Sequence, residues 1–173
     1  MVEHFILLVG LALILYFDGR YRKIPNWIVI PMVVLGFVVH VVSNGWEGII
    51  FSGLGFLVGL ALLFIPFALR GVGAGDVKLL AAIGALMGAK FVLTTFLYGA
   101  VIGGLWAMVI LFKQKSLGAT LRALLWNATV GLVNGASSRV PLRTLAAGRA
   151  WGFPYGVAMA IGGLIVLYHG VWF

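Results

Sequence analysis

Long apolar runs, separated by short polar segments, are the feature that most restricts how this chain can fold. The first run extends from Phe5 to Phe17 without a charged residue. Hydrophobic residues make up 63% of the 173 positions and charged residues 9%, whereas soluble domains are about half apolar and about a quarter charged. A helix needs about 20 mainly apolar residues to cross a bilayer. We therefore expect an all-α, polytopic membrane protein with a single domain over residues 1–173.

The polar breaks predict about six transmembrane helices. They cover residues 2–17, 27–43, 49–69, 77–88, 91–112 and 151–172. One unbroken helix over 77–112 would be about 54 Å long, far more than a hydrocarbon core of about 30 Å, so we place a break at Gly88-Ala89-Lys90. The short span 77–88 must then tilt, lie partly within protein, thin the bilayer or re-enter the side it came from. Leucines and valines within 113–150 recur at helical spacing, which predicts an amphipathic helix on the membrane surface.

Basic residues predict the orientation of this bundle. With six spans, loops 19–26, 70–78 and 113–150 share one side and contain every Lys and Arg of the twelve except Lys90. The positive-inside rule makes this side cytoplasmic and leaves both termini outside. The net charge of +8 is then explained by the basic cytoplasmic loops of a multi-pass protein in the inner (cytoplasmic) membrane. The partner it predicts is the lipid bilayer, not nucleic acid.

The chain contains only two aspartates, and both are predicted at the cytoplasmic face. Asp18 follows the first apolar run, where Asp18-Gly19 predicts a turn, and Asp76 ends the stretch Gly73-Ala74-Gly75-Asp76. Ionisable groups at a membrane are costly and by default suggest function. Two aspartates held close together share a proton, so one can activate a water while the other protonates a carbonyl oxygen or a leaving amine. Gly73 and Gly75 would let an extended substrate backbone approach. This combination predicts peptide hydrolysis.

Other interpretations of the same residues stay open at this point. Asp76 alone would serve to cap a helix, and Asp18 alone would serve to form a turn before a basic loop. A small proton- or cation-coupled transporter would use paired acids, and it would be expected to carry them near mid-membrane within repeated spans. A non-catalytic assembly subunit would keep the same fold. The chain has no cysteine and three scattered histidines, so no metal site and no organic cofactor is expected.

Three motifs together resemble those of the prepilin peptidase (type IV leader peptidase) family of GxGD aspartic proteases. Gly73-Ala74-Gly75-Asp76-Val77-Lys78 resembles the second catalytic motif, and Asp18 followed by Ile24-Pro25-Asn26 resembles the first. Pro154-Tyr155-Gly156 resembles a segment of the last span. The matches stand in the order of the family and extend over nearly the whole chain.

This resemblance implies a membrane aspartic endopeptidase with Asp18 and Asp76 as the catalytic pair, their acid and base roles undecided. It implies an active-site loop of Gly73, Gly75 and Lys78. The residues implied to position the substrate are Ile24, Pro25, Asn26, Arg20, Arg22, Pro154 and Gly156. The implied substrate is a type IV prepilin-like protein with a short basic leader and a hydrophobic helix after the cleavage site. The cysteine-free chain resembles the short form associated with Flp-type pili, so N-methylation of the product is not expected.

The predicted topology can be tested by cysteine labelling, because the native chain has no cysteine. Single cysteines at Lys90 and Ser43 should react with an impermeant reagent added outside intact cells, and one at Ser137 should react only after the cells are opened. External labelling of the Ser137→Cys variant would contradict the six-span arrangement.

Overall fold

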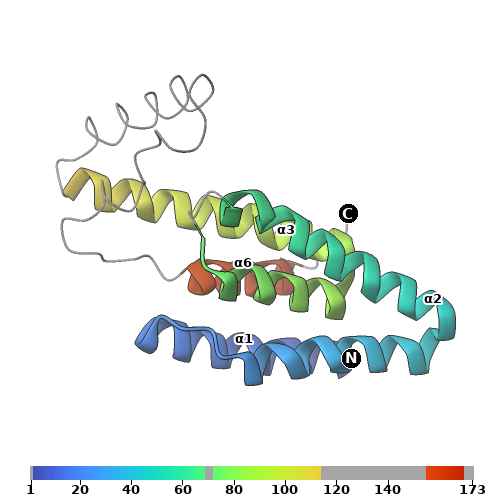
Figure 1. Ribbon diagram of the computed structural model, residues 1–173. Helices are drawn as coiled ribbons and strands as arrows, with labels where there is room; N and C mark the ends of the chain where they lie inside the picture. The colour runs from blue at the N-terminus through green and yellow to red at the C-terminus, as the bar shows by residue number, and fades with distance from the viewer. Residues whose placement is uncertain (1, 69–71, 114–154, 170–173) are drawn as a thin grey trace, which may run out of the picture. The chain divides into compact units, whose positions relative to one another are not determined.

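The computed structural model describes residues 2–68, 72–113 and 155–169, which form helices and no strand. In chain order these are α1 (Val2–Tyr21), α2 (Asn26–Ala68), α3 (Ala74–Lys113) and α6 (Tyr155–His169) (Figure 1). By length and composition, three helices of the described part can cross a membrane: α1, α2 and α3 as far as Trp106. The all-α fold class is confirmed, and the count of six spans stays a prediction.

The chain divides into two compact units, one formed by residues 1–103 with 154–173 and the other by residues 104–153. The contacts described below lie in the first unit. Of the second unit, the structure describes residues 104–113, which are the end of α3. Most of the second unit therefore lies outside the described residues, including nearly all of the 113–150 segment in which a surface amphipathic helix is predicted. The single domain over 1–173 likewise stays a prediction.

Two glycines divide the long helices α2 and α3 into two arms each. Gly45 has φ 56° and ψ −126°, and Gly88 has φ 83° and ψ 175°. Positive φ values of this kind are readily reached only without a Cβ atom, so each glycine allows the helix to change direction. At Gly45 α2 folds back on itself, as Figure 1 shows, and the backbone of Gly48 packs closely against that of His40. The break predicted at residues 88–90 is confirmed by the kink at Gly88.

The first arm of α3, residues 74–87, lies at the centre of the first unit. Every residue from Leu79 to Gly88 is buried. Small residues allow this close packing, because a Cβ atom on Gly55 of α2 would collide with the backbone of Gly84 and one on Gly36 would lie 2.9 Å from the carbonyl of Ala85. The short span predicted over 77–88 is therefore accommodated by lying within protein, one of the alternatives open from the sequence.

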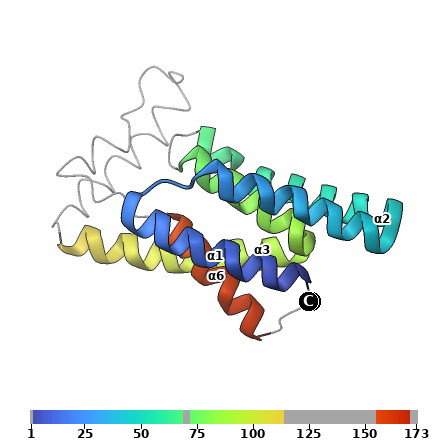
Figure 2. The same cartoon turned by 90° about the horizontal axis from the view of Figure 1, so that it is seen from below.

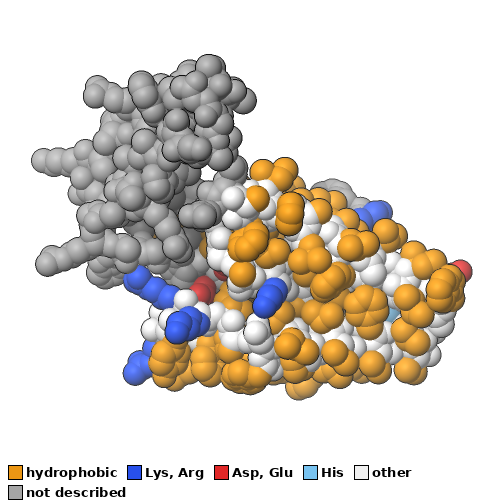
Figure 3. All heavy atoms as spheres, viewed as in Figure 1, with side chains coloured by type: hydrophobic (Ala, Val, Ile, Leu, Met, Phe, Trp, Pro, Cys, Tyr) orange, Lys and Arg blue, Asp and Glu red, His pale blue; other side chains and the backbone are white. Residues whose placement is uncertain are grey.

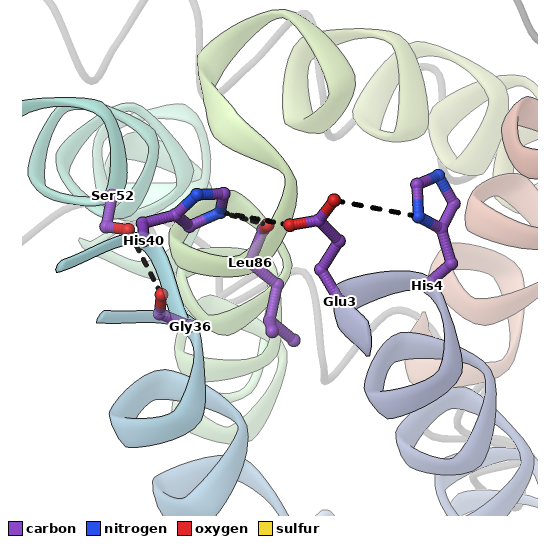
Figure 4. A network of polar contacts seen from close by, with 6 residues as sticks. All are labelled: Glu3, His4, Gly36, His40, Ser52 and Leu86. Atoms are coloured by element: carbon purple, nitrogen blue, oxygen red, sulfur yellow. Dashed lines mark hydrogen bonds and ion pairs between the residues drawn. The ribbon is translucent and has the colours of Figure 1, made fainter. Parts of the chain in front are cut away.

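A polar network binds the C-terminal end of this arm, near Leu86, to α1 and α2. The imidazole Nε2 of His40 lies 2.9 Å from the carbonyl oxygen of Leu86, to which it donates when the proton is on Nε2 (Figure 4). Glu3 Oε2 lies 3.8 Å from the same nitrogen, and Ser52 donates to the carbonyl of Gly36 at 3.4 Å. The kink at Gly88 ends the regular helix near Leu86, so a side-chain partner for that carbonyl replaces a helical one. The network thereby joins α1, α2 and α3.

The end of α1 differs from the prediction. The turn predicted at Asp18-Gly19 is wrong, because α1 continues through both residues to Tyr21. The helix ends where Arg22 adopts φ 52° and its N–H donates to the carbonyl of Asp18 at 3.0 Å. Helix α6 lies side by side with α1 (Figure 2). A Cβ atom on Gly163 of α6 would lie 3.1 Å from Leu11 Cδ1, so the two helices pack closely there. At Asp18 itself the side chain accepts from the N–H of Val157 in α6 at 3.0 Å. Tertiary contacts of this kind can outweigh the local preference of Asp-Gly for a turn.

The surface of the described helices is mainly apolar, as a bilayer-facing surface should be (Figure 3). Exposed large hydrophobic side chains occur on all of them, for example Phe5, Ile30, Leu57, Leu97 and Tyr168. Lys and Arg side chains gather at one end of this surface, beside an acidic side chain (Figure 3). The exposed residues at the end of α1 include Arg20, Arg22 and Lys23, which agrees with a membrane boundary at that end.

The glycine contact between α2 and α3 yields a stability prediction. Gly84→Ala should lower the free energy of unfolding by about 1–3 kcal/mol, because the added methyl group meets the carbonyl of Gly55 and backbone cannot move aside as a side chain can. Gly53→Ala is the matched control, since a Cβ atom there has no neighbour within 4 Å. It should leave stability unchanged or raise it by up to about 1 kcal/mol. Thermal unfolding in detergent measures both, and equal melting temperatures would contradict the close contact.

Candidate active site

Asp18 and Asp76 line the same cleft, although 58 positions separate them in the sequence. The cleft has a volume of about 500 Å³. It is formed by the end of α1, the connection to α2 and the start of α3. Its lining residues are Asp18, Arg22, Lys23, Ile24, Pro25, Asn26, Gly73, Gly75 and Asp76. The structure therefore brings together the two aspartates that the sequence singled out.

Asp18 is buried, with 5% of its surface exposed, and its carboxylate is bound by another helix. Oδ2 accepts a hydrogen bond from the backbone N–H of Val157 at 3.0 Å, across 139 positions of sequence. Val157 lies in the first turn of α6, where backbone N–H groups have no partner within the helix and form a positive end. The carboxylate thus satisfies these donors. A side chain engaged in this way does not make a local turn, so the purely local interpretation of Asp18 is wrong.

Asp76 caps the helix to which it belongs. Its Oδ2 accepts from the backbone N–H of Gly73 at 3.2 Å, and its own N–H donates to the carbonyl of Gly73 at 3.2 Å. Gly73 precedes the first residue of α3, so Asp76 takes the third helical position, from which a side chain can reach back to the cap. The capping role considered for Asp76 is present. It leaves Asp76 half-buried at the cleft, where capping and chemistry are compatible.

Gly156 lies close to both carboxylates. Its backbone N–H acts electrostatically on each of them, and the charge of Asp18 acts on Asp76. A Cβ atom at this position would lie 2.7 Å from Asp18 Oδ2 and 2.8 Å from Ile24 Cδ1. The close approach of α6 to the cleft therefore requires glycine here. The charge of Asp76 also acts on Tyr155, the first residue of α6.

The Ile24-Pro25-Asn26 segment forms one wall of the cleft and starts α2. A Cβ atom on Gly75 would lie 3.1 Å from Ile24 Cβ, so this wall packs tightly against the glycine loop. The carbonyl of Pro25 accepts from Ile28 N–H at 3.1 Å, which begins the helix.

Lys78 contacts this wall through Asn26, whose Oδ1 accepts from Lys78 Nζ at 3.4 Å. Asn26 also belongs to a neighbouring apolar groove of about 280 Å³, and Lys78 lines that groove, not the cleft.

Most of the predicted site residues therefore converge, with definite exceptions. Arg20 is exposed and is not part of the cleft lining, and Pro154 lies outside the described residues. Sequence reasoning missed the Val157 N–H as a partner of Asp18, and it missed Lys23 as a cleft residue. The signal for Val157 was available, because a proline shortly before a new helix places the following residues in a first turn with free N–H donors.

These features define a class of site: a pair of aspartates at one cleft in a helical protein with membrane-length helices. The chain belongs to the type IV leader peptidase family, whose family model matches residues 5–108. The matched region contains both aspartates, whereas α6 follows it.

Two curated relatives are similar over about half of this chain. The prepilin leader peptidase/N-methyltransferase of Bacillus subtilis (strain 168) is 30% identical over 92 residues, which are 51% of this chain and 36% of the relative. The preflagellin peptidase of Methanocaldococcus jannaschii is 32% identical over 91 residues, which are 50% of this chain and 38% of the relative. The matched segments thus span little more than a third of either relative. No solved structure matches the chain.

Proposed function

We propose that this protein is a membrane aspartic endopeptidase that removes the short basic leader from type IV prepilin-like proteins, with Flp-type pilins as the substrate class suggested by the family resemblance of its cysteine-free sequence. The observation that carries the proposal is the placement of Asp18 and Asp76, the only aspartates of the chain, at one cleft. Membership of the type IV leader peptidase family supports the same reaction. The names of both relatives, a prepilin and a preflagellin peptidase, support a pilin-like substrate.

The proposed chemistry follows from two carboxylates that share one proton. The ionised aspartate takes a proton from a water as the water oxygen bonds to the scissile carbonyl carbon, and the protonated aspartate gives its proton to the carbonyl oxygen. A tetrahedral diol results. The first aspartate then passes its proton to the amide nitrogen, the carbon–nitrogen bond breaks, and the second aspartate recovers a proton from the diol. Acid, amine and the original protonation of the pair are restored, without a metal or organic cofactor.

The surroundings of the pair fit this reaction. Gly73 and Gly75 line the cleft without side chains, which leaves room for the backbone of an extended peptide. Arg22, Ile24, Pro25 and Asn26 line the same cleft and are proposed to position the substrate. The exposed basic residues at this end of α1 support a cleft at the cytoplasmic membrane face. A leader held in the cytoplasm would reach the cleft there while the hydrophobic helix that follows it lies in the bilayer.

Substitution of either aspartate tests the proposal. Asp18→Asn and Asp76→Asn should each abolish cleavage while the protein still inserts into the membrane, because each removes one half of the proton-sharing pair. Glutamate at either position should reduce cleavage by about a hundredfold or more, since the added methylene displaces the carboxylate by about 1 Å. Co-expression with a candidate prepilin and measurement of the pilin size on a gel give the result.

The matched control for these variants is Glu47→Gln, which removes an exposed acid in the turn between the arms of α2. It should process the prepilin at the wild-type rate. Substantial processing by either asparagine variant would contradict the aspartate-pair mechanism and return the site to a binding or transport role.

The contact of Gly156 with Asp18 gives a second test. Gly156→Ala should lower the processing rate by about ten- to a hundredfold, because its methyl group would displace the Asp18 carboxylate from the Val157 N–H. Gly19→Ala is the control, since a Cβ atom next to Asp18 in α1 has no neighbour within 4 Å. Initial rates of prepilin cleavage in detergent compare the two variants. Equal rates would show that the carboxylate does not depend on its contact with α6.

A further inference from the structure

The apolar groove beside the cleft runs along the first arm of α2. Five residues of this arm line it: Asn26, Val29, Ile30, Val33 and Val34. They recur at positions i, i+3, i+4, i+7 and i+8, so they form a single face of the helix that is about 12 Å long. The groove, with a volume of about 280 Å³, starts at Asn26, which also lines the cleft. The two hollows are therefore continuous at this residue.

The opposite side of the groove belongs to the second arm of α2 and to α3. Phe56 and Leu60 of α2 are half-buried there, and Lys78 and Ala81 come from the first arm of α3. Ala81 is fully buried, whereas Ile30 on the facing side is 59% exposed. The groove thus combines a small residue at depth with an apolar edge on the bilayer-facing surface. This combination allows a second helix to approach closely within a membrane.

Asn26 and Lys78 mark the boundary between cleft and groove. The Nζ atom of Lys78 donates to Asn26 Oδ1 at 3.4 Å, so the two polar side chains of the groove lining are paired with each other. Lys78 follows Asp76 by two positions, about 200° around the axis of α3, so this helix presents a carboxylate to the cleft and an ammonium group to the groove. The rest of the groove lining is apolar. A peptide that leaves the cleft past Asn26 passes from polar to apolar surroundings.

The groove also runs in the direction that the proposed substrate requires. Its cleft end follows the exposed basic residues Arg22 and Lys23, which agree with a cytoplasmic membrane boundary. From there α2, which is long and apolar enough to cross a membrane, carries the groove into the bilayer. The proposed substrate has the same order of parts, with a basic leader before the cleavage site and a hydrophobic helix after it. A free lipid would fit the apolar part alone and would not account for the continuity with the cleft.

We infer that this groove is the docking site for the hydrophobic helix of the prepilin-like substrate, and that docking places the bond before that helix at Asp18 and Asp76. The inference rests on the proposed peptidase function and extends it from the reacting bond to the segment that follows. About two turns of the substrate helix lie along residues 26–34, with one face packed between the arm of α2 and its neighbours. Close packing of side chains stabilises this contact, because lipid chains are as apolar as the groove.

Disulfide cross-linking tests the docking site, because the native chain has no cysteine. The substrate is a prepilin that the wild-type protein processes, with single cysteines placed through the start of its hydrophobic helix. Ile30→Cys, in an Asp76→Asn background that leaves the substrate uncleaved, should form disulfides with prepilin positions that recur every three or four residues. Leu54→Cys in the same background is the matched control. It is 55% exposed against 59% for Ile30, lies outside the groove lining and should form no disulfide.

A groove filled by a larger side chain should weaken substrate binding. Val34→Trp should raise the KM for the same prepilin by about tenfold with a smaller change in kcat, because the indole ring occupies space that the substrate helix needs and leaves the aspartates in place. Leu35→Trp changes the next exposed position, which is outside the groove lining, and should leave both constants unchanged. Initial rates in detergent over a range of prepilin concentrations give the two constants.

The outcomes separate the docking site from the peptidase function. No disulfide from Ile30→Cys, or equal disulfide formation by Leu54→Cys, with Asp76→Asn inactive, would overturn the docking site alone. Wild-type KM in Val34→Trp, or disulfides spread evenly along the prepilin helix, would do the same and would return the groove to lipid. An Asp76→Asn variant that still cleaves, or a wild-type protein that processes no prepilin, would instead overturn the proposed peptidase mechanism.

Discussion

A carboxylate buried in an apolar helix must find hydrogen-bond donors, and the site depends on how Asp18 finds them. An unsatisfied charge in such a place would cost several kcal/mol, so the helix could not keep Asp18 buried alone. The donors are the N–H groups of the first turn of α6, of which that of Val157 donates to Asp18 Oδ2 at 3.0 Å. These groups have no partner in their own helix, which makes the contact favourable for both elements. The beginning and the end of the described chain are thereby joined at the cleft.

The second half of the site depends on the short first arm of α3. Its N-terminal end carries Asp76 and its far end is fastened by His40 through the carbonyl of Leu86. Between these ends the arm is buried from Leu79 to Gly88, with glycines of α2 in contact with its backbone. Lipid chains give little driving force for helix association, so close backbone contacts of this kind are the main source of packing energy. Rigid placement of Asp76 follows from that packing.

Local patterns were sufficient for several features of the fold. The apolar runs and the length limit of a bilayer predicted helices throughout, and the glycine at 88 predicted the break that the structure has at that residue. Local patterns failed at Asp18-Gly19, where the preference of the dipeptide for a turn is outweighed by tertiary contacts of α1. The family resemblance also implied Lys78 in the active-site loop; its side chain donates to Asn26 Oδ1 and lines the neighbouring groove. Helical periodicity places Lys78 two residues after Asp76, about 200° around the helix axis, so the two side chains leave on different faces.

The sequence by itself determined the helical class, the two aspartates, the glycines beside them and the order of the motifs. These are properties of residue type and spacing along the chain, and they need no knowledge of which segments meet. Only the tertiary structure decided that the aspartates line one cleft, that the first turn of α6 donates to Asp18, and that Arg22 lies in the lining while Arg20 does not. Contacts across 139 positions depend on how helices pack, and packing reflects the combined shape of many side chains. The sequence can indicate that Val157 lies in a first turn with a free N–H, but no local pattern shows that this N–H meets Asp18, so their contact could be found only in three dimensions.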